Sequence, residues 1–414
     1  MLLYLYWVVT GALSQPERIK RLIYSSYISI TIVKICLLTL EYPPHEIGAA
    51  IACRRIAKTL AKKVEVHVLS FARDTMHAKK KSMLAHDIED GVNVHRISRY
   101  PRSARTDVAQ DIQVLCSFLE KLDKRHRFDI FHGFDIAGAG FAACFISKKR
   151  KKSSVVSVRG DEMGKSMFDP KFFGSIRWTL ESADHLAFAS DELMQDADIM
   201  TPVKDKSTVI PSSLDPFEFF YRDIKLKLDG FVVGFAGVAR RDRGFGYLLE
   251  AFARFKESHK ATLLIVGELL LEEKAAFMKL IEELGIQDSI MITGRVPHHI
   301  ILNYLGIADV FILPATASGS SEILLEAMFC RRPVITTRKG AGEELIEHNN
   351  DGILIEENST ESIYRALQKL AKSKRLRTKL GENAKKRIIS EHTPEREQKQ
   401  LLAIYRKLCK KKRQ

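Results

Sequence analysis

Short apolar runs alternate with longer amphipathic segments along most of the chain after residue 34. Bounded apolar runs indicate buried strands, whereas apolar residues spaced three or four apart indicate amphipathic helices. In the first half these patterns predict strands at 35–40, 65–70, 92–96, 129–132, 155–158, 185–189 and 207–210. They predict helices at 49–62 and 107–121. The alternation is typical of a parallel sheet with crossover helices.

The same alternation starts again at Phe231. Strands are predicted at 231–236, 261–266, 289–292, 310–313 and 333–336. Helices are predicted at 247–257, 272–284, 300–306, 323–328, 361–373 and 376–390. We therefore predict an α/β fold of two doubly wound, Rossmann-like domains, with ligands bound in a central cleft at the carboxyl ends of the strands.

These patterns divide the chain into four predicted parts. The first domain covers 32–222, the second covers 223–392, and 393–414 forms a last helix with a basic tail. Residues 1–31 form an extension whose apolar run is too short to span a bilayer. We expect this extension to be a disordered arm or the product of an upstream start codon; a membrane-surface anchor is the alternative.

Composition narrows the class of protein but not its partner. A hydrophobic content of 45% and a charged content of 28% are those of a soluble globular protein. The formal charge of +15 indicates an anionic partner, either nucleic acid, acidic lipid or a phosphorylated substrate. The six cysteines are scattered without metal-ligand or redox spacing, which favours reduced thiols in a cytoplasmic protein.

The segment 308–352 carries the clearest chemical signal. An apolar run stopped by Pro314 predicts a buried strand, and a loop of small residues leads into a helix that contains Glu326. Unpaired N–H groups at such a helix start bind phosphate. The Glu326 carboxylate, about one turn inside, can reach sugar hydroxyls. This layout suits a nucleoside diphosphate linked to a sugar.

This segment resembles the donor-binding signature of the retaining glycosyltransferases of family four, which have the GT-B fold. Glu326 falls on the second glutamate of the family pattern, which holds the donor ribose. The first glutamate is expected at position 318, where this chain has Ser318. Glu322 lies nearby and either substitutes for it or is a solvated carboxylate of the first helical turn. The resemblance assigns the small-residue loop, Ser318, Gly319 and Ser320, to the donor.

Further motifs match the family over about residues 34–408. Gly48 opens a helix after the first strand, where the family has two adjacent glycines and this chain has Gly48 and Ala49. Arg159 and Asp161 follow a strand at the position where the family places a cleft-facing histidine, and the resemblance makes them the candidate catalytic pair. Since Arg159 stays protonated, it cannot act as a base. The structural alternative is a turn held by a salt bridge.

The second domain adds four donor-binding candidates. Arg243 matches a family lysine that holds the donor diphosphate, and Arg240 lies close to the position of the family arginine that Val238 replaces. Gly267 matches a strand-to-glycine turn near the donor, and Val296 lies in the loop that holds the nucleotide base.

The histidines and the small-residue segment 138–143 give weaker signals. His132, His298 and His299 do not form a metal-ligand set. His132 ends a strand and either lines the cleft or is a satisfied structural histidine. The segment 138–143 mimics a dinucleotide-binding loop, but its small residues also permit close packing of a helix on a sheet.

The resemblance implies a metal-independent, nucleotide-sugar-dependent glycosyltransferase of the cytoplasm. It needs no cofactor beyond a UDP- or GDP-sugar co-substrate, and its acceptor is a glycan, a lipid-linked molecule or a small molecule, with peripheral contact at the inner membrane face as an option. The alternative is a degenerate relative that binds nucleotide or glycan without turnover, motivated by Ser318, Val238 and Ala49. The least favoured hypothesis is a nucleic-acid-binding module, because the sequence contains no recognised nucleic-acid-binding motif. We therefore expect no nucleic-acid partner.

Overall fold

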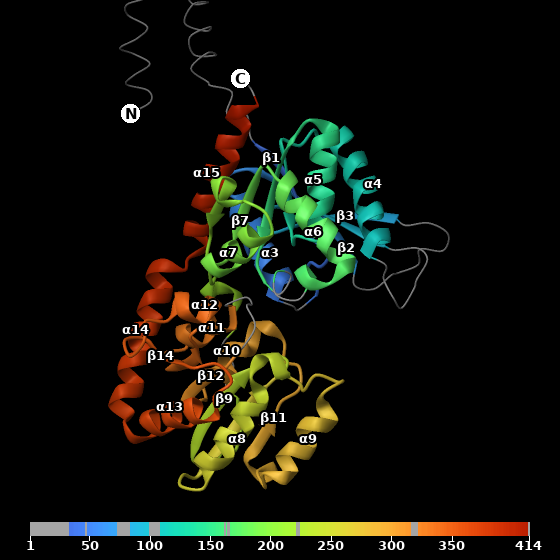
Figure 1. The fold of residues 1–414 in the computed structure, drawn as a ribbon. Helices are drawn as coiled ribbons and strands as arrows, with labels where there is room; N and C mark the ends of the chain where they lie inside the picture. Colours follow the sequence, from blue (N-terminus) through green and yellow to red (C-terminus); the bar gives the residue numbers. More distant parts are fainter. Residues whose placement is uncertain are drawn as a thin grey trace, which may run out of the picture. The chain divides into compact units, whose positions relative to one another are not determined.

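The computed structural model describes residues 33–45, 48–72, 83–98, 108–160, 163, 166–220, 224–315 and 322–412 (Figure 1). All elements below belong to one compact unit, Lys34–Gln414. Asp161, Ser318, Gly319, Ser320 and the predicted extension 1–31 lie outside the described residues.

The first half of this unit contains an eight-stranded sheet in the order β3-β4-β2-β1-β5-β6-β7-β8. Its strands are β1 (Lys34–Leu38), β2 (Glu65–Phe71), β3 (Met83–Glu89), β4 (Val92–Ser98), β5 (Ile130–Phe134), β6 (Ser153–Val158), β7 (His185–Phe188) and β8 (Ser207–Val209). All neighbours pair in parallel except β3, which is antiparallel to β4. The central strands are almost wholly buried, as expected for a sheet covered on both faces.

Helices cover this sheet between successive strands. They are α3 (Gly48–Ala61), α4 (Val108–His126), α5 (Ala139–Arg150), α6 (Pro170–Ser182) and α7 (Asp191–Met200). Helices α4, α5 and α6 pack side by side (Figure 1). Strand β5 and helix α5 approach closely, because a Cβ atom on Gly133 would lie 2.4 Å from Cα of Gly140. The small residues of 138–143 therefore serve helix–sheet packing.

The second half contains a six-stranded parallel sheet in the order β11-β10-β9-β12-β13-β14. Its strands are β9 (Phe231–Ala236), β10 (Ala261–Val266), β11 (Ile290–Ile292), β12 (Val310–Leu313), β13 (Val334–Thr337) and β14 (Gly352–Ile355). Its helices are α8 (Phe245–Lys256), α9 (Lys274–Glu283), α10 (Ile301–Leu305), α11 (Glu322–Phe329), α12 (Gly340–Leu345), α13 (Thr360–Lys372) and α14 (Lys374–Glu391). One continuous core of buried aliphatic and phenylalanine side chains joins this sheet to its helices.

The last helix, α15 (Pro394–Lys411), packs against α3 beside the first sheet. Its Tyr405 hydroxyl lies 2.7 Å from Nδ1 of His132 on β5. Thr393 caps the helix by accepting a hydrogen bond from the backbone N–H of Arg396, and Pro394 occupies its first turn. Residues near the end of the chain thus complete the packing around its first strands.

The observed elements confirm the predicted fold class, two α/β halves built on parallel sheets. The hairpin strand β3 is missing from the prediction because most of its side chains are exposed, including Met83 and Ile88. Among the described residues, no helix is both long and apolar enough to cross a membrane.

Candidate functional site

Helix α11 supplies the central carboxylate of the candidate site. It follows the buried strand β12, and Glu326 lies on its second turn with only 4% of its surface exposed. Leu324, Leu325 and Ala327 around it are buried in the core of the second half. A carboxylate in such surroundings needs hydrogen-bond partners to stay charged.

The partner of Glu326 is His298, which begins the short turn before α10. Nε2 of His298 lies 2.6 Å from Oε1 of Glu326. Burial by itself lowers the pKa of His298, but the hydrogen bond to Glu326 and the charges of nearby carboxylates outweigh it, so the pKa lies above its ordinary value. His298 therefore favours the protonated form that donates to Glu326. From the sequence, we assign no metal-ligand role to His298 and do not predict its contact with Glu326.

Glu322, on the first turn of α11, faces an arginine from the other half of the unit. Its Oε1 lies 3.6 Å from Nη2 of Arg55 on α3, and only 12% of its side chain is exposed. Burial raises the pKa of Glu322, while the charges of Arg55 and Arg159 act against this rise. The option of a solvated first-turn carboxylate is therefore wrong, because the Glu322 side chain faces Arg55 and is largely shielded from water.

Arg159, at the end of β6, belongs to a buried network of charges and hydroxyls. Its Nη1 donates to Oε1 of Glu397 at 3.0 Å, and its Nη2 donates to Oγ of Ser212 at 2.9 Å. Oγ of Ser213 donates to Oε2 of Glu397 at 2.6 Å and accepts from Nε of Arg55 at 3.0 Å. Glu397 on α15 thus holds both arginines in place. The catalytic role assigned to Arg159 stays a prediction.

Two guanidinium N–H groups of this network are buried without a hydrogen-bond partner among the described residues. They belong to Nη2 of Arg55 and Nε of Arg159. A buried donor left unpaired costs about 1–3 kcal/mol. Such groups are suited to an anionic or hydroxyl-rich ligand that accepts their hydrogen bonds.

His132 is a satisfied structural histidine in this surrounding. Besides Tyr405, it contacts Oγ of Ser157 through Nε2 at 2.9 Å. Burial, assisted by the charge of Arg159, lowers the pKa of His132 to about 3. His132 is fully buried. It is therefore a structural histidine and does not line the cleft.

The loops after β9 and β10 approach each other at positions that require glycine. Gly267 has a φ of +148°, and a Cβ atom there would lie 2.1 Å from the carbonyl oxygen of Gly237. Gly244 has a φ of +65°, and a Cβ atom there would lie 2.0 Å from the carbonyl oxygen of Pro314. The glycines hold these loops against the carboxyl ends of the strands, next to the loop that precedes α11.

The predicted phosphate-binding arginines lie on this loop. Arg243 ends a single turn, Arg241–Arg243, and its backbone N–H donates to the carbonyl of Arg240 at 3.0 Å. Nε of Arg240 lies 2.8 Å from Oδ1 of Asp242. Both arginines are therefore at the carboxyl edge of the second sheet.

Gly48 and Val296 occupy the remaining predicted positions. Gly48 is the first residue of α3, the helix that carries Arg55. Val296 is partly buried against the core of the second half, after Gly294, which has a φ of +70°. The structure thus brings Glu322 and Glu326 together with Arg55 and His298, while the roles of Gly48 and Val296 stay predictions.

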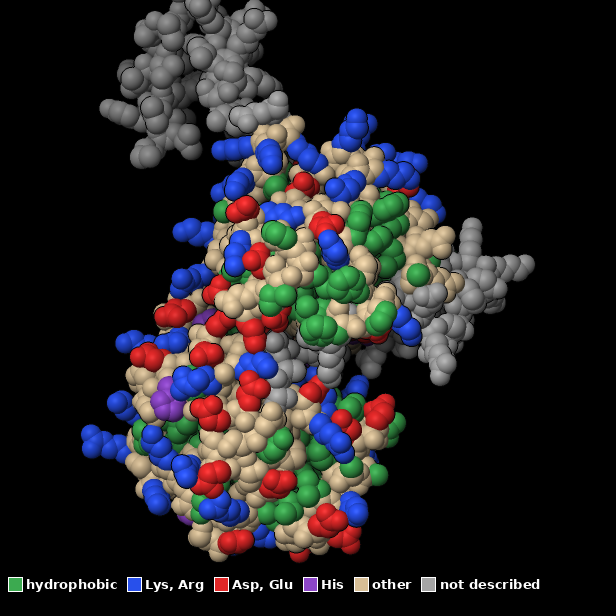
Figure 2. Space-filling view, viewed as in Figure 1, with side chains coloured by type: hydrophobic (Ala, Val, Ile, Leu, Met, Phe, Trp, Pro, Cys, Tyr) green, Lys and Arg blue, Asp and Glu red, His purple; other side chains and the backbone are tan. Residues whose placement is uncertain are grey.

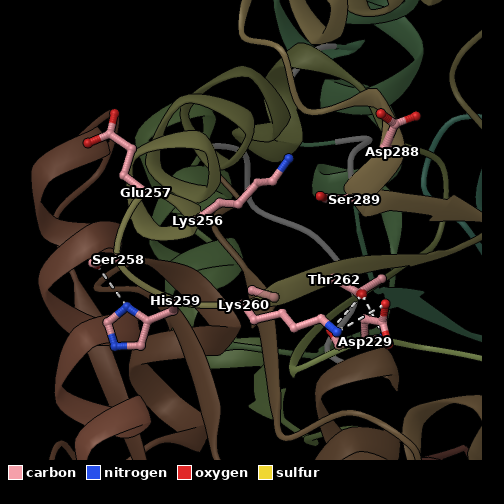
Figure 3. A pocket seen from close by; sticks show the side chains of 10 residues that line it. Asp229, Lys256, Glu257, Ser258, His259, Lys260, Thr262, Asp288 and Ser289 are labelled. Carbon is pink, nitrogen blue, oxygen red and sulfur yellow. Dashed lines mark hydrogen bonds and ion pairs between the residues drawn. The ribbon is translucent and has the colours of Figure 1, made fainter.

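A small cavity of about 10 Å³ lies among these groups, and Arg55, Ser213, Glu218, His298, Glu322 and Glu326 line it. Ligand pockets usually hold some 300 Å³ or more. A larger hollow of about 510 Å³, drawn in Figure 3, lies between Asp229, Lys260 and Asp288 at the amino-terminal ends of β9 and β10. Another hollow of about 780 Å³, lined by Val238, Leu269 and Gly294 among others, follows the carboxyl ends of β9, β10 and β11. Since ligands of open α/β sheets bind at carboxyl ends, the hollow beside Asp229 is set aside, and the cavity at α11 is the candidate site because it contains Glu326.

The basic residues do not form one binding surface on the face shown in Figure 2. Lys and Arg side chains are spread widely there and are mixed with Asp and Glu. This arrangement gives no support to a nucleic-acid-binding surface on that face, since such proteins gather their positive charge in a patch or stripe.

Comparisons with known proteins match both halves of the chain to glycosyltransferase families. Residues 48–216 match the family described as Glycosyltransferase Family 4, and residues 217–387 match the family described as Glycosyl transferases group 1. The chain is 24% identical to an uncharacterised glycosyltransferase of Methanocaldococcus jannaschii over 90% of this chain and 98% of the relative. It is 25% identical to N-acetyl-alpha-D-glucosaminyl L-malate synthase of Bacillus anthracis over 76% of this chain and 82% of the relative.

Solved structures share the fold. Sucrose-phosphate synthase from Thermosynechococcus elongatus matches 91% of this chain and 99% of its own, with a TM-score of 0.78 and 18% identity. The Anabaena protein HepE, solved in complex with UDP and glucose, matches 91% of this chain and 100% of its own, with a TM-score of 0.70 and 16% identity. The two-sheet architecture is therefore that of GT-B proteins.

Proposed function

Because the chain belongs to the glycosyltransferases of family four, we propose that it transfers a sugar from a nucleotide-sugar donor to an acceptor hydroxyl with retention of anomeric configuration. The observation that carries this proposal is the buried carboxylate of Glu326, held by His298 at the carboxyl edge of the second sheet and adjoining a cavity that Arg55 closes. A carboxylate there is suited to the paired hydroxyls of a ribose.

The donor diphosphate lies, in this proposal, between the start of α11 and the loop Arg241–Arg243. Backbone N–H groups at a helix start and guanidinium groups both favour phosphate oxygens. Negative charge grows on the departing nucleoside diphosphate as the sugar leaves, so these groups stabilise the transition state more than the bound donor. Arg243 and the loop 318–320 are the proposed donor contacts.

The acceptor is activated without a protein base. The leaving phosphate oxygen takes the proton of the incoming hydroxyl on the same face of the sugar. Arg159 fits this scheme as a positioning residue, because it stays protonated and its guanidinium is held by Glu397 and Ser212. No metal and no further cofactor is required for transfer.

Donor binding requires the contact between α3 and α11 to open. The cavity of about 10 Å³ is far smaller than a nucleotide sugar. The Arg55–Glu322 ion pair closes it, at a distance of 3.6 Å. Arg55 then exchanges the Glu322 carboxylate for a phosphate or hydroxyl of the ligand, which gives its Nη2 group the hydrogen bond that it lacks.

Titration calorimetry with UDP and GDP tests this function first, followed by turnover of the corresponding sugar donors in EDTA. UDP is the first choice because HepE was solved with it, and L-malate belongs in the acceptor panel because the name of the Bacillus relative contains it. Saturable nucleotide binding together with sugar transfer supports the proposal. Binding without hydrolysis or transfer of any donor would indicate a degenerate relative instead.

A further inference from the structure

Three histidines gather at the beginning of the first sheet, away from the candidate site. His67 on β2 and His95 on β4 are 1% and 3% exposed, and His126 is the last residue of α4. Each offers a ring nitrogen, and these three nitrogens all lie within 4.8 Å of one another. They come from two strands and a helix that are distant in sequence, so the fold alone brings them together.

The hydrogen bonds of this cluster leave one nitrogen without a partner. Oε1 of Glu65 lies 3.1 Å from Nε2 of His67, which places the proton of His67 on Nε2. Nδ1 of His67 then accepts from Nε2 of His95 at 2.9 Å. Nδ1 of His95 is left as a buried lone pair with no hydrogen-bond partner among the described residues.

These hydrogen bonds are those of neutral imidazoles, because Nδ1 of His67 accepts from His95 and Nδ1 of His95 contacts no acceptor in the part of the chain that the structure describes. Neutral imidazole is the form in which histidine binds metal ions. Lys34 and Arg125 are cations near the cluster and disfavour an added charge, whereas Glu65 and the carboxyl end of α4 favour it.

We propose that His67, His95 and His126 bind a zinc ion that joins β2, β4 and α4. Zinc bonds of about 2.0–2.1 Å in a tetrahedron place ligand nitrogens about 3.3 Å apart. Nδ1 of His67 and Nε2 of His95 already lie 2.9 Å apart, and both bind the ion once the proton of His95 moves from Nε2 to Nδ1. Rotation of the His126 ring closes the remaining distance. Water completes the four ligands.

The surroundings of His67 are those of a metal ligand. Metal-bound histidines usually donate their other ring N–H to a carboxylate, which fixes the ring and makes it more basic. Glu65 takes this place, and it is itself held by Lys34 at 3.0 Å. The ring of Phe128 packs edge-on against His67 with 5.0 Å between centroids and limits its movement.

This zinc site is independent of sugar transfer. The cluster lies beside the beginnings of β1 and β5, since Glu65 pairs with Lys34 and His126 precedes Ile130. The candidate donor site lies at the opposite, carboxyl ends of the strands. The ion is therefore expected to stabilise the first sheet and to leave nucleotide affinity unchanged.

Competition titration of EDTA-stripped, dialysed protein with zinc and a chromogenic chelator tests the proposal. Wild type is expected to bind one zinc ion per chain, and cobalt is expected to give the intense visible absorption of tetrahedral coordination. His126→Ala, which changes the least buried ligand, is expected to abolish both signals. Glu65→Gln is expected to weaken zinc binding about 10–100-fold. His259→Ala, in the second half, is the matched control and is expected to bind as wild type does.

Circular dichroism shows whether each variant is folded. Wild type that binds no zinc, or His126→Ala that binds it with unchanged affinity, would overturn the proposal. Equal losses in His126→Ala and His259→Ala would also overturn it, since zinc would then bind to the surface. None of these outcomes depends on whether the chain transfers a sugar.

Discussion

Glu326 is the residue on which donor binding depends most directly. Glu326→Gln keeps the shape of the side chain but removes the charge that His298 and the donor ribose share. We expect nucleotide affinity to fall by about 1–3 kcal/mol, the typical range for a hydrogen bond to a charged group. Calorimetric titration measures this loss. Glu283→Gln, on the exposed face of α9, is the control and should bind as wild type does; equal affinities for all three proteins would exclude Glu326 from the site.

His298 makes stability depend on pH in a direction set by its raised pKa. A histidine whose pKa is raised on folding adds stability below its unfolded pKa of about 6.5, and this contribution disappears as the pH rises through the folded value. The advantage of wild type over His298→Gln should therefore be larger at about pH 6 than at about pH 9. Urea denaturation at both pH values checks this; an advantage that grows towards pH 9 would contradict it.

Some site residues can be identified from a short stretch of sequence, and others cannot. Glu326 and Gly267 were found because a strand, a turn and a helix follow each other within a short segment. Arg55, His298 and Glu397 were missed because each acts on a partner in another element. Glu397 meets Arg159 across 238 positions of sequence. No pattern along a single chain carries such a pairing.

At the scale of elements, the predicted strands match the buried strands of both sheets except β14, because buried parallel strands are short apolar runs. Strand β14 is buried but was not predicted. The prediction failed at β3, an exposed edge strand whose side chains carry little apolar signal. Helix α4 extends to His126, beyond the predicted end at 121, because its last turn is polar and basic. Amphipathic periodicity identifies the buried part of a helix more accurately than it identifies the residue at which the helix ends.

Helix α15 should be essential to the stability of the first half. Glu397→Gln removes the charge that faces Arg159 and the hydroxyl of Ser213. Removing one partner of a buried ion pair typically costs about 3–5 kcal/mol, and we expect a loss of this size in the free energy of unfolding. The exposed pair Lys279–Glu283 gives the comparison. Glu283→Gln there should cost at most about 1 kcal/mol.

Chemical denaturation of both variants measures the two costs. A loss for Glu397→Gln as small as that for Glu283→Gln would show that the buried network is not needed for stability. Arg159→Met in the Glu397→Gln background tests the coupling directly, because it removes the second charge. We expect the double variant to be less destabilised than the sum of both single variants.

At the scale of the whole molecule, buried histidines should make the protein sensitive to mild acid. The pKa values of His67, His95 and His132 are lowered by burial to about 4, 3 and 3. Below about pH 6.5 the unfolded chain takes up protons that the folded chain does not, so stability falls as pH falls towards these values. Asp135, whose pKa burial raises to about 6, acts in the opposite direction, as do Glu322 and His298, whose pKa values are also raised.

Denaturation in EDTA at about pH 7 and about pH 5 measures this loss. His132→Asn should lose roughly 1–2 kcal/mol less than wild type over that interval, because it cannot take up the proton. His259→Asn is the control and should follow wild type. An identical loss in His132→Asn and wild type would show that His132 does not contribute to acid sensitivity.

The pairing of Arg159 with Glu397 also bears on how the chain is made. At synthesis rates of about 5–20 residues per second, roughly 12–48 s separate the appearance of the two residues, which lie 238 positions apart. During this interval the emerging first half holds a cation whose counter-charge has not yet been translated. A ribosome that stalls before residue 397 therefore releases an incomplete chain with an unneutralised interior, which proteases and chaperones can distinguish from the finished enzyme.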